Sequence, residues 1–190
     1  MFKFIGALAA LALSVSAAEA QEVSDCSSVD SAGVRTLCRE ADFPAEPARL
    51  WALWSDPEQL STWMAPVATI DLRPGGMMEA AYDVSGHIGD PNNILNRVVA
   101  VDPMHSLSLQ VERAPPGFPH PVEVRELVTV IEFAPAGEHA TRVRVSMAGY
   151  REGQAFDELY AFFAAGNSWT LRKLGERITN GPFQWAEDGE

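Results

Sequence analysis

Basic residues are scarce in this sequence. Lysine and arginine together number 14 against 26 aspartates and glutamates, which gives a formal net charge of −12 at pH 7. A chain this acidic repels the phosphates of nucleic acids and of anionic membranes. We therefore expect no nucleic-acid partner. The acidity itself is more often a source of solubility than the sign of a cationic partner.

Apolar runs long enough to cross a membrane are also missing. One run, residues 4–15, follows Lys3 and is too short to span a bilayer comfortably. The small-x-small sequence Ala18-Glu19-Ala20 is typical of a signal-peptidase site. We therefore predict a signal peptide over residues 1–20, no membrane anchor and a periplasmic or secreted protein. A transmembrane anchor is the alternative, and Gln21 instead of cysteine after the cleavage site disfavours a lipoprotein.

Only two cysteines are present, Cys26 and Cys38, and both follow the predicted cleavage site. An even number in a chain bound for an oxidising compartment predicts a disulfide. This bond would clip an N-terminal extension, residues 21–33, to the first strand. Its short loop limits the stabilisation to about 3 kcal/mol. The alternative is a redox-active pair, which needs a CxxC-like spacing and a helix N-terminus, and both are absent.

Signatures of known chemistry are few. The sequence has no Gly-x-Ser-x-Gly motif, no context for an activated cysteine and no glycine-rich phosphate loop. Metal binding needs several ligands at suitable spacing. No two histidines lie at i, i+2 or i, i+4. The alternative is a metal site that uses His87 and Asp90, which lie in one loop. We therefore predict no catalytic motif, no metal and no cofactor, with the histidines in exposed turns: His87, His105, His120 and His139.

Alternating apolar residues and turn signals predict a mainly antiparallel sheet. A tight hairpin turn is expected at Arg73-Pro74-Gly75-Gly76, where glycine tolerates positive φ. If Met78 faces inward, Ala80, Tyr82 and Val84 do too, because side chains alternate along a strand. Residues 86–93 and the proline-rich 114–121 are predicted loops. The predicted strands are 34–43, 67–72, 77–84, 94–101, 106–111, 123–133 and 141–147.

Three helices complete the pattern. A helix over 48–54 is followed by a short one in which Ser55 and Glu58 have capping-box spacing and Pro57 lies in the first turn. The longest helix, about 154–179, contains no proline and ends at Gly181-Pro182. Two glycines inside it cost about 1 kcal/mol each relative to alanine. One domain of sheet on helix, class α+β, is therefore predicted over residues 34–180, with a tail over 181–190.

The order of these motifs resembles the helix-grip, START-like superfamily (SRPBCC proteins), and most closely its branch named after the activator of the heat-shock-protein ATPase. The resemblance extends over residues 34–179 and depends on Asp56-Pro57-Glu58, Trp63, residues 71–76, residues 141–143 and Trp169. It implies a curved sheet of about six to seven strands wrapped around the long helix, often with a cavity between them. The signal peptide and the extension depart from the family pattern and disfavour co-chaperone work on a cytosolic ATPase.

The same resemblance implies which side chains face such a cavity. Methionines and aromatic rings form adaptable apolar walls, and the tyrosines and an asparagine could orient a ligand by hydrogen bonds. The alternative is that these side chains simply fill the core. The positions that match the cavity-facing strands and helix are Trp63, Met78, Tyr82, Met147, Phe156, Tyr160, Phe163 and Asn167.

Three functions remain open, and we favour the first. It is an extracytoplasmic protein that binds a small hydrophobic or aromatic molecule without chemistry. The second is a cyclase-, dehydratase- or hydrolase-like enzyme, which needs a titratable group in the cavity, such as Tyr82, Tyr160, Glu126 or Asp157. The third is a protein-interaction module with a filled core and an exposed apolar patch near Trp51, Trp54 or residues 115–121. The oligomeric state is not predicted.

Overall fold

The computed structural model describes residues 21–185 of the chain. The predicted signal peptide lies outside these residues. None of the helices in this range combines the length and the hydropathy that crossing a bilayer requires.

One antiparallel sheet contains all the strands of this range, in the order β1-β3-β9-β8-β7-β6-β5-β4 with β2 also paired to β3. The predicted fold class is confirmed, but the number of strands is nine, because β1 and β2 of the extension add to the predicted six to seven. The strands are β1 (Ser24–Asp25), β2 (Ser28–Val29), β3 (Arg35–Phe43), β4 (Val67–Ile70), β5 (Met77–Ala81), β6 (Ile94–Asp102), β7 (Ser106–Arg113), β8 (Val128–Pro135) and β9 (Thr141–Tyr150).

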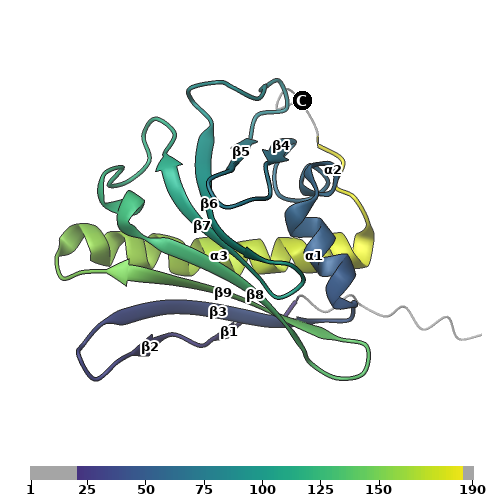
Figure 1. Cartoon of the computed structure of the whole chain (residues 1–190), viewed down its shortest axis with the longest axis horizontal. Coiled ribbons are helices and arrows are strands. Elements are labelled where there is room, and N and C mark those ends of the chain that lie inside the picture. Colours follow the sequence, from purple (N-terminus) through teal and green to yellow (C-terminus); the bar gives the residue numbers. More distant parts are fainter. Residues whose placement is uncertain (1–20, 186–190) are drawn as a thin grey trace, which may run out of the picture.

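The sheet curves along the long helix α3 (Gln154–Asn180), which contacts β3 and β9 (Figure 1). Helices α1 (Pro47–Ser55) and α2 (Pro57–Leu60) lie near the C-terminal end of α3. The helix is unbroken despite its internal glycines. At Gly175 a Cβ atom would come within 2.7 Å of the Cβ of Gln21, so this glycine makes room for the start of the described chain.

Three local predictions need correction. Asp56, not Ser55, caps α2 by accepting a hydrogen bond from the Glu58 backbone N–H at 2.9 Å. Strand β5 ends at Ala81, because the Asp83 carboxylate accepts from the Ser85 N–H in a turn. The predicted strand 123–133 begins instead with a 3₁₀ helix, η1 (Glu123–Glu126), where Val124 is fully buried after a positive φ at His120.

The predicted hairpin at residues 71–77 is present. Gly75 has φ of +82°, and its N–H donates to the Val98 carbonyl at 2.8 Å. The Val98 N–H in turn donates to Gly76 at 2.8 Å, which joins the turn to β6. This register brings Met78 of β5 opposite Asn96 of β6.

The predicted disulfide joins Cys26 to Cys38 across a Cα–Cα distance of 4.8 Å. Cys38 lies in β3, so the bond ties the extension to the first long strand, as expected. Arg39 beside it forms an ion pair with Asp25 at 2.6 Å and donates to the Ser168 hydroxyl of α3 at 3.2 Å. The extension is therefore linked to both the sheet and the long helix.

Candidate functional site

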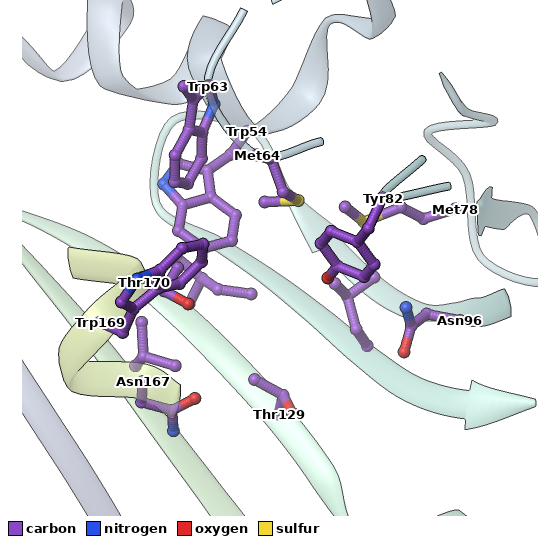
Figure 2. A pocket seen from close by; sticks show the side chains of 13 residues that line it. Trp54, Trp63, Met64, Met78, Tyr82, Asn96, Thr129, Asn167, Trp169 and Thr170 are labelled. Carbon is purple, nitrogen blue, oxygen red and sulfur yellow. The ribbon is translucent and has the colours of Figure 1, made fainter. Parts of the chain in front are cut away.

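A cavity of about 150 Å³ lies between the sheet, the α1–α2 region and the C-terminal half of α3 (Figure 2). Strands β5 to β9 supply its floor. Its walls come from α1, from the segment that follows α2 and from α3. Its lining consists of Trp54, Trp63, Met64, Met78, Tyr82, Asn96, Leu109, Thr129, Ile131, Val145, Asn167, Trp169 and Thr170.

One wall is aromatic and rich in sulfur. The rings of Trp54 and Trp63 meet edge to face with centroids 5.0 Å apart, Met64 stands beside them, and Met78 lies beside Tyr82 (Figure 2). The Trp63 indole N–H donates to the Leu53 carbonyl at 2.7 Å, which holds that ring in place. Such a wall offers a large, adaptable surface for an apolar molecule.

The opposite side of the cavity carries three polar side chains beside the apolar Leu109, Ile131 and Val145. Asn96 comes from β6, Thr129 from β8 and Asn167 from α3 (Figure 2). Asn167 is only 8% exposed, and its amide nitrogen has no acceptor among residues 21–185. An amide nitrogen buried without an acceptor costs about 1–3 kcal/mol.

Tyr82 stands at the mouth of the cavity. It is 64% exposed, so water reaches the ring. A tyrosine phenol ordinarily titrates at about pH 10, so at neutral pH its hydroxyl is a neutral hydrogen-bonding group.

The segment after α3 supports the aromatic wall. The Phe183 N–H donates to the Thr62 carbonyl at 2.9 Å, and the Trp185 indole donates to the Ser61 carbonyl at 2.6 Å. Arg177 of α3 donates to the Thr62 hydroxyl at 2.8 Å. Residues 181–185, predicted as part of a tail, thus hold the turn from which Trp63 and Met64 project.

Comparison with known protein families gives a match over residues 44–179 to the family described as "Activator of Hsp90 ATPase homolog 1-like protein". The chain belongs to this family. A comparison with curated protein sequences found no significant match.

Solved structures share this fold. The protein Ms6760 from Mycobacterium smegmatis is 27% identical, with a TM-score of 0.59, over 84% of this chain and 99% of that one. CalU16 from Micromonospora echinospora is 17% identical at a TM-score of 0.59, over 84% and 87% of the two chains. The Aha1 dimer from Colwellia psychrerythraea is 13% identical at a TM-score of 0.59, over 77% and 97%.

In this family member, the structure divides the eight predicted cavity residues into two groups. Trp63, Met78, Tyr82 and Asn167 line the cavity together. The other four are Met147, Phe156, Tyr160 and Phe163. They belong to a separate apolar cluster at the N-terminal half of α3, together with Leu37, Val124, Leu127, Tyr150 and Leu159.

Several lining residues were not predicted from the sequence. Asn96 could have been found, because the Gly75-Gly76 turn sets the pairing that places it opposite Met78. Trp169 is two residues after Asn167 on the same helix. Thr129 and Val145 had no such signal, since their exposure to the cavity depends on how far α1 and α2 stand from the sheet.

The candidate acid–base groups are dispersed. Tyr82 is the single titratable side chain among the lining residues. Asp157 forms an ion pair with Arg35 at 2.6 Å, and Tyr160 lies under the same Arg35 guanidinium, 5.3 Å from ring centroid to Cζ. Glu126 forms an ion pair with Arg151. The cavity lining therefore offers no carboxylate for proton transfer.

The histidines likewise lie away from the cavity lining. His120 contacts the Glu158 carboxylate at 2.6 Å, and His139 contacts that of Glu46 at 3.3 Å. Within residues 21–185, no group of three or more histidine, cysteine, aspartate or glutamate side chains is arranged to hold a metal ion.

Proposed function

We propose that this protein is an extracytoplasmic binding protein that holds a small apolar or aromatic molecule in the cavity between its sheet and the C-terminal half of α3. The main support is the lining itself, in which Trp54, Trp63 and Met64 lie together and Met78 adds a second thioether beside Tyr82. Ligand sites are generally concave, mostly apolar and equipped with a few polar groups that orient the ligand. This cavity has all three properties.

The volume limits the size of the ligand. An apolar protein cavity of about 150 Å³ accommodates benzene, and the cavity here has a volume of about 150 Å³. One ring therefore fits inside it. A larger molecule would extend outward past the exposed rings of Tyr82 and Trp169.

Binding without chemistry is favoured by the charge of the lining. General acid–base catalysis needs a group that gains or loses a proton near neutral pH. A tyrosine phenol is neutral there, and the lining has no titratable side chain besides Tyr82. The cavity is thus equipped to hold and orient a ligand.

An extracytoplasmic location is supported by the disulfide and by the predicted signal peptide. The test is the intact mass of the protein recovered from the extracytoplasmic fraction of its own cells. We expect a chain that starts at Gln21 and whose mass is lower than that of its reduced form by two hydrogen atoms. A full-length, reduced chain in the cytoplasmic fraction would contradict this location.

Ligand binding is tested by filling the cavity. We expect native mass spectrometry of the protein from its own cells to show a bound apolar molecule, released on denaturation. Val145→Phe should abolish this adduct, because Val145 lies in the floor. Val99→Phe is the matched control, since Val99 is 42% exposed on β6 and does not line the cavity. An adduct retained by Val145→Phe would place the ligand elsewhere, and an adduct-free wild type that also fails to take up added toluene would contradict the proposal.

A further inference from the structure

The cavity has two chemically different sides, and this property limits the kind of molecule it can hold. In Figure 2 the indoles of Trp54 and Trp63 and the thioether of Met64 lie on the upper side, while Thr129 and Asn167 lie on the lower side and Asn96 at the lower right. A purely apolar molecule would contact the rings and thioether of the first side favourably, although the Trp54 indole nitrogen there also has no acceptor within residues 21–185. Such a molecule would leave the polar groups of the second side without partners.

The polar groups are available to a ligand. Within residues 21–185, the side chains of Asn96, Thr129 and Asn167 form no hydrogen bond with the protein, whereas Thr170 donates to the Gly166 carbonyl at 3.0 Å. Asn167 is more than nine-tenths buried. Its amide nitrogen is enclosed and has no acceptor among residues 21–185, whereas its amide oxygen points toward Thr129 in Figure 2 and is the atom that a molecule in the cavity would reach.

Charge complementarity excludes an ionic ligand. No lysine, arginine, aspartate or glutamate is among the lining residues, so an ionised group would lose its hydration without gaining a counter-charge. The net charge of −12 adds a repulsion against anions. Hydroxyl and carbonyl groups fit better, because amides and a threonine hydroxyl can both donate and accept hydrogen bonds.

We infer that the ligand is an uncharged one-ring molecule with a hydroxyl or carbonyl on one edge, held so that this edge faces Asn96, Thr129 and Asn167 and its ring faces the indoles. A phenol is the simplest member of this class. This inference rests on the proposed function. It specifies both the polarity of the ligand and its orientation.

The test compares three probes of similar size by ¹⁹F NMR titration of the purified protein: 4-fluorophenol, 4-fluorotoluene and 4-fluorobenzoate. We expect 4-fluorophenol to bind about fivefold more tightly than 4-fluorotoluene, which corresponds to one net hydrogen bond between neutral groups. We expect 4-fluorobenzoate to bind most weakly. Equal binding of phenol and toluene, or tightest binding of benzoate, would overturn the inference while leaving the cavity's binding function intact.

Two variants locate the polar edge. Asn167→Leu should remove most of the preference for phenol while retaining or strengthening the binding of 4-fluorotoluene, and Thr129→Val gives a second, smaller change at the same side. Asn180→Leu is the matched control, because Asn180 is exposed at the end of the same helix. A preference that survives both cavity substitutions would overturn the assignment. Failure of all three probes to bind wild type would instead contradict the proposed function on which it rests.

Discussion

The two halves of α3 pack against one sheet in different ways. The N-terminal half places Phe156, Leu159 and Phe163 into a filled cluster that η1 covers from the far side. The C-terminal half presents Asn167, Trp169 and Thr170 to a cavity whose other indoles come from α1 and the segment after α2. We refer to these as the filled half and the open half.

The difference follows from the size of the helical side chains. In the filled half, the helix itself supplies rings that reach the sheet. In the open half, Gly166, Asn167 and Thr170 are short, so the space above the sheet is enclosed by Trp169 at its edge and by the indoles of Trp54 and Trp63, which come from other segments. Short polar residues on the buried face of a helix therefore mark a cavity better than an aromatic stripe does.

The largest effect is expected in the filled half. Leu159 is fully buried, and truncating a buried leucine to alanine leaves a cavity, so Leu159→Ala should lower the free energy of unfolding by about 3 kcal/mol. Urea denaturation measures this loss. Arg172→Ala on the exposed face should change stability by no more than about 0.5 kcal/mol. A loss below about 1 kcal/mol for Leu159→Ala would show that this half is loosely packed.

The disulfide should affect stability without affecting the open half. Replacing both Cys26 and Cys38 by alanine should lower the free energy of unfolding by about 2 kcal/mol, because the unfolded chain regains the freedom of a short loop. The affinity for 4-fluorotoluene should stay the same. A large loss of affinity would mean that the extension shapes the cavity, through the bond from Arg39 to Ser168.

Asn167→Leu should have a small effect on stability, opposite in sign to that of Leu159→Ala. The substitution removes a buried amide that has no acceptor within residues 21–185, so the free energy of unfolding should stay constant or rise by up to about 1 kcal/mol. Urea denaturation again provides the measurement. A loss of more than about 1 kcal/mol would show that Asn167 is part of a filled core.

A tyrosine in each half gives the finest distinction. Burial raises the pKa of Tyr150 above the ordinary value of 10.0, with the nearby Tyr160 as a second cause, whereas Tyr82 is exposed. Because the folded state holds the Tyr150 proton more tightly, this tyrosine stabilises the fold fully below pH 10.0 and loses this contribution as the pH rises further.

Binding of 4-fluorotoluene should raise the pKa of Tyr82 by displacing water from the cavity mouth, while the pKa of Tyr150 should not change. Ultraviolet titration of phenolate, with Tyr82→Phe, Tyr150→Phe and Tyr160→Phe to assign the three tyrosine transitions, measures both. A shift confined to Tyr150 would place the probe in the filled half.

Much of the fold was predictable from the sequence, because strand alternation, the Gly75-Gly76 turn and the proline-free C-terminal helix are local signals. Strands β1 and β2 were missed since two-residue strands have no periodicity and depend on pairing with β3. The site was predicted only in half. Phe156, Phe163 and Asn167 lie on one face of α3 at helical spacing. The elements that cover the two parts of this face are η1 and α1, which lie far from α3 in the sequence.

The central claim is that the open half binds a small molecule and the filled half does not. The five tryptophans test it directly, because Trp54, Trp63 and Trp169 line the cavity whereas Trp51 and Trp185 do not. In a ¹H–¹⁵N spectrum titrated with 4-fluorophenol, we predict saturable shifts of the first three indole signals and constant positions for the other two. No saturable shift, or equal shifts of all five signals, would contradict the claim.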